Sequence, residues 1–240
     1  MIPPCSIYGV ALTIRKFNSH RFRMKDFIEM GTLTAELAVR LEGYVVERKN
    51  ILICGGTSSG KSTLANVLTE YIPNHERIVL IEDTAELQSQ KENVVRFEAR
   101  REQGGLPAVT IRDPLKATLR HRPDRIILGE IRGGEAFDLL QLLNTGTAAR
   151  FRRSMATPPP RGLSRFATCV LQSGVEIPYA AIKANIADSL NIIVQIERRP
   201  GVRFVSEVLE LCEFSPEADR YEFHPVYSQA PPRNTKAHHG

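Results

Sequence analysis

The sequence predicts an α/β fold with a twisted, mostly parallel sheet, because strands of the buried kind alternate with helical segments. Short apolar runs, typical of strands covered on both faces, occur at residues 51–54, 78–81 and 125–130. Apolar residues at helical spacing lie between and after these runs, at residues 61–72, 110–119 and 135–143. Alternation of this kind is typical of parallel sheets.

The two ends of the chain carry weaker signals. Residues 10–14 are strand-like, residues 24–30 suggest a short helix, and Thr34 is placed to cap a longer helix that follows it. Residues 191–196 predict another strand, with a hairpin partner at 203–212 across Pro200 and Gly201. The last ten residues are polar and are expected to be disordered.

Composition is that of an ordinary globular protein, with 42% hydrophobic and 25% charged residues in 240. No apolar run approaches the roughly 18 residues that cross a membrane, and the amino terminus does not resemble a secretory signal. The four cysteines are widely separated and the six histidines lack metal-ligand spacing, so neither disulfides nor a zinc site is predicted.

The net charge of +5 is local. Residues 147–165 hold five arginines and no acidic residue, and without them the charge is about zero. A basic cluster confined to one segment is weak support for nucleic-acid binding, and no direct contact with nucleic acid is predicted.

Residues 55–62 match the phosphate-binding pattern G-x-x-x-x-G-K-[ST] at every fixed position. A strand before the loop and a helix after it give the context in which main-chain amides converge on phosphate oxygens. Lys61 is expected to bridge the β- and γ-phosphates of ATP, and the Ser62 hydroxyl to ligate Mg²⁺. The predicted nucleotide-binding residues are Gly55, Gly56, Thr57, Ser58, Ser59, Gly60, Lys61, Ser62 and Thr63.

Acidic residues end two of the predicted strands. Glu130 follows the third strand, where a Walker B acid would hold Mg²⁺ or a metal-bound water. Glu82 and Asp83 follow the second, and the carboxyl ends of parallel strands share one crevice. We favour Glu82 for chemistry and Asp83 for a structural role, as the cap of a following helix. A solvated acid at a strand end is the alternative for Glu130.

Three arginines near these acids have open roles. Arg120 and Arg122 are as well suited to a nucleotide, on this subunit or a neighbouring one, as to pairing with acids. The sequence assigns no role to Arg132.

Together these segments resemble the type II/type IV secretion traffic ATPases (the GspE family), and within them the conjugal transfer members. The matching stretches include GGTSSGKSTLAN at residues 55–66, RIVLIEDTAELQ at 77–88, and residues 100–146 and 177–199. The resemblance implies a RecA-like core in which Glu82 is the catalytic acid-base residue and Glu130 the Walker B carboxylate. It also implies a homohexameric ring on the cytoplasmic face of the inner membrane, peripherally associated and in contact with inner-membrane components of the transfer apparatus.

The sequence departs from the family pattern in two places. The family's amino-terminal domain is expected to be largely missing, so residues 1–45 are interpreted as its remnant with a linker, 46–227 as the ATPase domain and 228–240 as a disordered tail. The family's His box should follow Gly146, but residues 147–155 read TAARFRRSM. Deleting one C from the first histidine codon of G-H-G-G-S-I-S-T-V-H reproduces this reading, so we hypothesise a compensated pair of frameshifts across residues 147–161. A divergent arginine-rich loop is the alternative.

The sequence therefore predicts an ATP-hydrolysing motor subunit that powers assembly of a pilus or mating channel. Its activity is expected to be impaired by the altered His box and the missing domain. The alternative is a degenerate ring subunit that binds nucleotide and has a structural role only.

Overall fold

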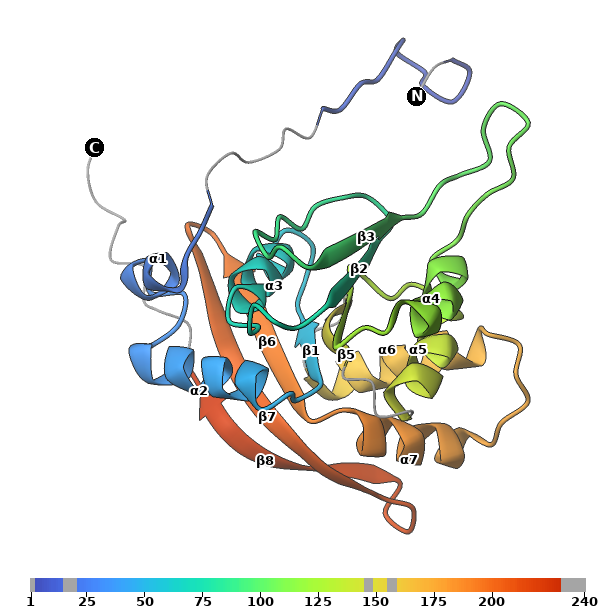
Figure 1. The fold of residues 1–240 in the computed structure, drawn as a ribbon. Coiled ribbons are helices and arrows are strands. Elements are labelled where there is room, and N and C mark those ends of the chain that lie inside the picture. Colours follow the sequence, from blue (N-terminus) through green and yellow to red (C-terminus); the bar gives the residue numbers. More distant parts are fainter. Residues whose placement is uncertain (1–2, 15–20, 145–148, 155–158, 230–240) are drawn as a thin grey trace, which may run out of the picture.

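The computed structural model describes residues 3–14, 21–144, 149–154 and 159–229, with the backbone alone at 149–154, 159 and 160. Within them, eight strands form one sheet in the order β3-β2-β4-β5-β1-β6-β7-β8 (Figure 1). The strands are β1 Ile51–Cys54, β2 Ile78–Glu82, β3 Val94–Glu98, β4 Arg125–Leu128, β5 Ala149–Ser154, β6 Ile192–Arg199, β7 Val202–Ser215 and β8 Arg220–Ser228. Strands β3 to β6 in this order run parallel, and β7 and β8 extend the sheet as antiparallel strands.

The helices cover both faces of this sheet, which confirms the predicted α/β class (Figure 1). Their bounds are α1 Met24–Glu29, α2 Ala35–Val46, α3 Lys61–Thr69, α4 Arg112–Thr118, α5 Glu135–Asn144, α6 Pro159–Leu171 and α7 Tyr179–Ser189, with a 3-10 turn η1 at Leu119–His121. Alternate residues of each central strand face opposite helix layers, as strand geometry requires. In β1, Leu52 packs toward α4–α7, whereas Ile53 packs toward α1–α3.

Most predicted elements are present, with small shifts at their ends. The helix expected at 61–72 ends at Thr69, three residues early, and the helix expected at 110–119 spans Arg112–Thr118. Thr34 caps α2 as predicted, since its hydroxyl accepts a hydrogen bond from the Leu37 amide at 3.2 Å. Strands β3, β5 and β8 were not predicted from the sequence.

The strand-like reading of residues 10–14 is wrong for this structure. That segment belongs to no strand, and Val10, Leu12 and Ile14 are 75%, 80% and 73% exposed. An extended segment becomes a strand only where a neighbour accepts and donates its main-chain hydrogen bonds, and none of the strands that the structure describes pairs with these residues.

Residues of α1 and α2 are packed into the core on the α3 side. Phe27, Leu41 and Val45 are almost fully buried in the same cluster as strand β1. The Val205 amide on β7 also donates to the Thr32 carbonyl at 2.7 Å. The domain boundary expected near residue 45 stays a prediction, and the tail expected from residue 228 onward lies almost wholly outside the described residues.

The first residue of β4, Arg125, forms a buried ion pair with Glu76 and also contacts the end of α2. The Arg125 side chain is fully buried and donates from Nη2 to Glu76 Oε1 at 2.9 Å and from Nη1 to the Val45 carbonyl at 2.9 Å. Arg48 Nη2 donates to the same Glu76 oxygen at 2.8 Å. Burial alone would raise the pKa of Glu76, but the hydrogen bonds and charges of Arg125 and Arg48 hold it below its ordinary value.

Within the described residues, no helix combines the length and apolar character needed to cross a membrane.

Candidate nucleotide-binding site

The phosphate-binding loop predicted at residues 55–62 connects the central strand β1 to helix α3. It lies at the carboxyl edge of the parallel strands, where ligands of open α/β sheets bind. Gly60 immediately precedes the helix with φ 104°, a left-handed conformation that favours glycine. At Gly55 an added Cβ would lie 2.3 Å from the Ile196 carbonyl oxygen, so the neighbouring strand β6 leaves room only for hydrogen.

Lys61 begins helix α3 and turns back over the loop. Its side chain is buried, and Nζ donates to the Gly55 carbonyl at 2.9 Å and to the Gly56 carbonyl at 2.5 Å. The Ser59 hydroxyl is buried without a hydrogen-bond partner. The loop therefore places an ammonium group and an unused polar atom beside main-chain groups that a phosphate can contact.

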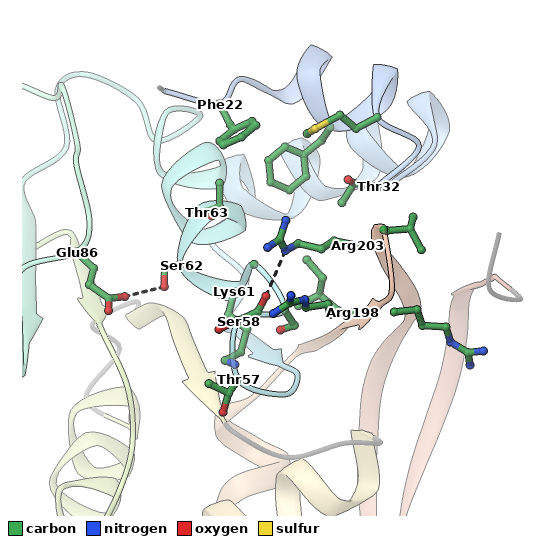
Figure 2. A pocket seen from close by; sticks show the side chains of 18 of the residues that line it. Phe22, Thr32, Thr57, Ser58, Lys61, Ser62, Thr63, Glu86, Arg198 and Arg203 are labelled. Carbon is green, nitrogen blue, oxygen red and sulfur yellow. Dashed lines mark hydrogen bonds between the residues drawn. The ribbon is translucent and has the colours of Figure 1, made fainter. Parts of the chain in front are cut away.

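A cavity of about 870 Å³ opens over this loop (Figure 2). The predicted residues 57–63 form its floor, and Glu86, Glu130 and Arg132 line it as well. Residues of the β6–β7 hairpin and of the segment around α1 complete the lining: Phe22, Phe27, Met30, Thr32, Ile196, Arg198, Arg199, Gly201, Val202 and Arg203. The structure thus gathers residues from four other stretches of sequence around the phosphate loop.

Glu130 reaches this cavity, as the prediction for a Walker B acid requires. It lies two residues beyond the end of β4, and its side chain is 16% exposed. Its Oε1 accepts a hydrogen bond from Arg132 Nη2 at 2.7 Å. The same arginine donates from Nη1 to Asp83 Oδ2 at 3.1 Å.

Glu82 lies beside the cavity but is turned into the protein. It is 2% exposed and does not line the cavity. Its Oε1 accepts hydrogen bonds from the amides of Glu86 at 3.1 Å and Leu87 at 3.0 Å, and Arg96 lies 3.8 Å from Oε2. In this conformation the Glu82 carboxylate organises the loop after β2. Its catalytic role stays a prediction.

Glu86, and not Glu82, is the acid of the loop after β2 that faces the cavity. It lines the cavity, and its Oε2 accepts a hydrogen bond from the Ser62 hydroxyl at 2.8 Å (Figure 2). No catalytic or metal-binding role for Glu86 was predicted from the sequence. The available signal was its position four residues after Glu82, on a loop that leaves the carboxyl edge of the sheet.

The predicted capping role of Asp83 is wrong. No helix follows it, because residues 83–93 run as an irregular loop that is held by the Glu82 carboxylate. Asp83 instead pairs with Arg132 at 3.1 Å. It keeps a structural role, but as the partner of a cation.

Two of the three arginines with open roles lie away from the site. Arg120 and Arg122 do not line the cavity, whereas Arg132 does. The altered His box at residues 147–161 falls almost entirely outside the described side chains.

The β6–β7 hairpin forms a wall of the cavity that was not predicted from the sequence. Arg203 Nε donates to the Ser58 carbonyl at 3.2 Å, which fixes the hairpin against the phosphate loop (Figure 2). Three arginines (Arg198, Arg199 and Arg203) make this wall basic. The signal was present in the run RRPGVR, because β6 is parallel to β1 and ends at the same edge of the sheet.

The residues present fit a nucleoside triphosphate with magnesium. The floor supplies main-chain groups and Lys61 for phosphates, and Phe22, Phe27 and Met30 give the opposite end an apolar surface suited to a base. Mg²⁺ in such sites is held by one or two protein oxygens together with phosphates and water, for which the Ser62 hydroxyl and the Glu130 carboxylate are suited.

The loop, the parallel sheet and the acid beyond β4 define a P-loop nucleotide-binding protein with a RecA-like core. The family described as "Type II/IV secretion system protein" matches residues 2–199. The chain therefore belongs to that family, and the resemblance seen in the sequence is confirmed.

Individual relatives agree with this assignment. The chain is 33% identical over 214 residues to "Conjugal transfer protein TrbB" of Rhizobium radiobacter, covering 88% of this chain and 63% of that protein. It is 38% identical over 157 residues to "Type IV secretion system protein PtlH" of Bordetella pertussis, covering 64% of this chain and 46% of that one. The chain thus spans about two thirds or less of the length of these relatives.

A solved structure shows the same fold. The VirB11 ATPase from the type IV secretion system of Brucella suis, in complex with sulphate, superposes with a TM-score of 0.66 at 27% identity. The match covers 82% of this chain and 67% of the VirB11 chain.

Proposed function

We propose that this chain binds Mg²⁺–ATP and hydrolyses it as a motor subunit of a conjugal transfer (type IV secretion) system, powering assembly of a pilus or mating channel. The observation that carries the proposal is the single cavity in which Lys61, Ser62 and Glu130 all take part. The named relatives and VirB11 belong to such systems, which supports the cellular role.

The roles follow from the position of each group. Lys61 would exchange its contacts with the Gly55 and Gly56 carbonyls for phosphate oxygens, because an ammonium group binds an anion more strongly than a neutral carbonyl. Ser62 and Glu130 would hold the metal, which when bound supplies neutralising charge to the phosphates. The basic hairpin wall adds to the anion-attracting field of the cavity.

An acid must orient the attacking water, and two carboxylates are candidates. Glu82 holds this role by resemblance to the family, and it would act only after releasing the amides of Glu86 and Leu87. Glu86 already borders the cavity and contacts Ser62.

Release of inorganic phosphate from ATP by the purified chain tests the proposal. The K61A variant should lose activity by about 10²-fold or more, since one preorganised charge contact of this kind contributes that much. If Glu82 is the base, E82Q should bind ATP normally and hydrolyse it about 10²- to 10⁴-fold more slowly. E86Q should then be affected much less.

An R40A variant serves as the matched control, because Arg40 is an exposed residue paired with Glu36 on α2, away from the cavity. Turnover by K61A equal to that of R40A and of the unaltered chain would overturn the proposal. A large loss in E86Q with little change in E82Q would move the catalytic role to Glu86.

A second candidate is a degenerate ring subunit that binds ATP without turnover. The residues TAARFRRSM at 147–155 favour it, because they contain no histidine where the family pattern places its His box. Mixed rings with an active relative would separate the two candidates. If the subunit is purely structural, rings that contain its K61A variant should support assembly of the pilus or channel as well as rings that contain the unaltered chain. If it is a motor subunit, the K61A rings should not.

The proposal extends to partners and location. We infer a homohexameric ring that associates peripherally with the cytoplasmic face of the inner membrane and contacts inner-membrane components of the transfer apparatus. The basis is the family assignment and the conjugal transfer relatives.

A further inference from the structure

Arg132 spans the gap between the ends of two neighbouring strands. Its guanidinium donates to Glu130 beyond β4 at 2.7 Å and to Asp83 beyond β2 at 3.1 Å. These acids lie next to each other because β2 and β4 are paired in parallel and end at the same edge of the sheet. Hydrogen bonding to Glu130, with the charges of Glu130 and Asp83, raises the pKa of the arginine, so it stays a cation throughout.

The main chain of Arg132 is fixed, whereas its side chain is not enclosed. Glu135, at the start of α5, accepts hydrogen bonds from the amides of Arg132 and of Gly133. The Arg132 side chain is 56% exposed and lines the cavity. The guanidinium can therefore change partners without movement of the strands.

The Glu130 carboxylate is paired with the Arg132 guanidinium in this structure, and the proposed function has it bind magnesium. A carboxylate oxygen that accepts a charged hydrogen bond must give it up before it can ligate a metal ion or a metal-bound water in the same direction. Arg132 and Mg²⁺ are therefore competitors for Glu130.

We propose that Arg132 is a positioning residue that holds Glu130 until magnesium arrives and then remains with Asp83, beside the nucleotide. In the absence of metal it keeps Glu130 from repelling the phosphates. Once metal is bound, the released guanidinium adds its charge to the anion-binding surface of the cavity. This inference rests on the proposed function of the cavity as a Mg²⁺–ATP site.

Loss of the Arg132 side chain should weaken ATP binding when metal is absent, but should make Mg²⁺ binding easier when the nucleotide is present. In EDTA, R132A should bind a fluorescent ATP analogue more weakly, because Glu130 then loses the Arg132 guanidinium that neutralises it. With the analogue present, R132A should need less Mg²⁺ for half-maximal tightening of binding, because the metal no longer displaces a guanidinium. Each shift should be about threefold or more, the size expected of a partly exposed ion pair.

Three variants sharpen the test. R132K keeps the charge and should fall between R132A and the unaltered chain in both measurements. Combined with E130Q, R132A should no longer lower the Mg²⁺ requirement, because the competition is for the Glu130 carboxylate. R40A, on an exposed pair outside the cavity, should change neither value.

The outcomes separate this inference from the proposed function. An unchanged or increased Mg²⁺ requirement in R132A, in a chain whose ATP binding still depends on Lys61, overturns the role of Arg132 alone. Equal weakening with and without metal shows a general structural effect and also overturns it. Failure of the unaltered chain to bind the analogue under either condition overturns both.

Discussion

At the scale of single residues, the phosphate loop packs so closely against strand β6 that some of its positions, such as Gly55, have no room for a side chain. The pattern of glycines, lysine and serine could be predicted from the sequence, because its spacing alone implies the loop. The pairs Ser62–Glu86 and Glu130–Arg132 could not. They depend on which strands are neighbours and on where the loop after β2 turns, and local patterns carry neither.

Gly55→Ala tests the closest of these contacts. A methyl group would lie 2.3 Å from the Ile196 carbonyl oxygen and 2.6 Å from the Ser59 hydroxyl, so either the loop or strand β6 must move. We expect ATP binding to be lost and the free energy of unfolding to fall by about 1–3 kcal/mol. Denaturant titration and ATP titration measure the two effects.

Gly43→Ala is the matched control for that variant. Gly43 lies inside α2, and an added Cβ would meet nothing within 4 Å. This substitution should stabilise the chain by about 0.5–1 kcal/mol, because alanine favours the helix. A Gly55→Ala variant as stable as Gly43→Ala, with normal ATP binding, would contradict the geometry of the loop.

At the scale of elements, strand β4 is held in place by a buried ion pair as well as by its neighbours. Arg125 begins the strand that leads to Glu130. It pairs with Glu76 and donates directly to the Val45 carbonyl at the carboxyl end of α2. The sequence predicted β4 and α2 separately, because each has a clear apolar pattern. Their connection joins residues 45, 76 and 125, and no local pattern encodes it.

Removing the charge of Glu76 should destabilise the chain strongly. In Glu76→Gln the guanidinium of Arg125 would remain buried without its carboxylate, at a cost of about 3–5 kcal/mol. Glu36→Gln, which affects the exposed pair with Arg40, should cost no more than about 0.5 kcal/mol. Denaturant unfolding at neutral pH compares the two, and equal stability of both variants would refute the importance of the buried pair.

The same pair gives stability a definite pH dependence. The folded-state pKa of Glu76 lies below its ordinary value of 4.5, so its contribution is complete above that value. It is lost as the pH falls further, through the folded-state pKa, because the folded state resists the proton that the unfolded state accepts. Unfolding measured from pH 7 downward should show this loss in the unaltered chain, and a shallower slope in Glu76→Gln.

Two strands at the edges of the sheet were not predicted. Strand β8 carries a mixed polar pattern because it is an edge strand with half-exposed residues. Strand β3 is likewise at an edge of the sheet and has an exposed face. Strands β1, β2 and β4 were predictable because they consist of continuous buried apolar residues. Strand β5 is also central, but its arginine-rich sequence lacks that pattern.

At the scale of the whole molecule, the fold class and family followed from the sequence, whereas the shape of the cavity did not. Its walls come from α1, the loop after β2 and the β6–β7 hairpin, which lie far apart along the chain. Only the folded sheet order brings them together. Phe22 and Arg203, for example, have no sequence feature that connects them.

The proposed ring gives a prediction at this scale. Light scattering behind size exclusion should show a hexamer, favoured by ATP, because subunits of such rings complete one another's sites. The K61A variant cannot hold the phosphates, so the fraction of hexamer it forms should be the same with and without ATP. A monomer under every condition would contradict the ring for this chain.

The measurement that bears most directly on the central claim is calorimetric titration of ATP, with magnesium, into the unaltered chain and into K61A. One site per chain should be seen, and the affinity should fall by about 10²-fold or more in K61A, because Lys61 supplies the central charge of the phosphate loop. Equal binding by the two proteins, or no binding by the unaltered chain, would show that residues 55–63 do not hold a nucleotide.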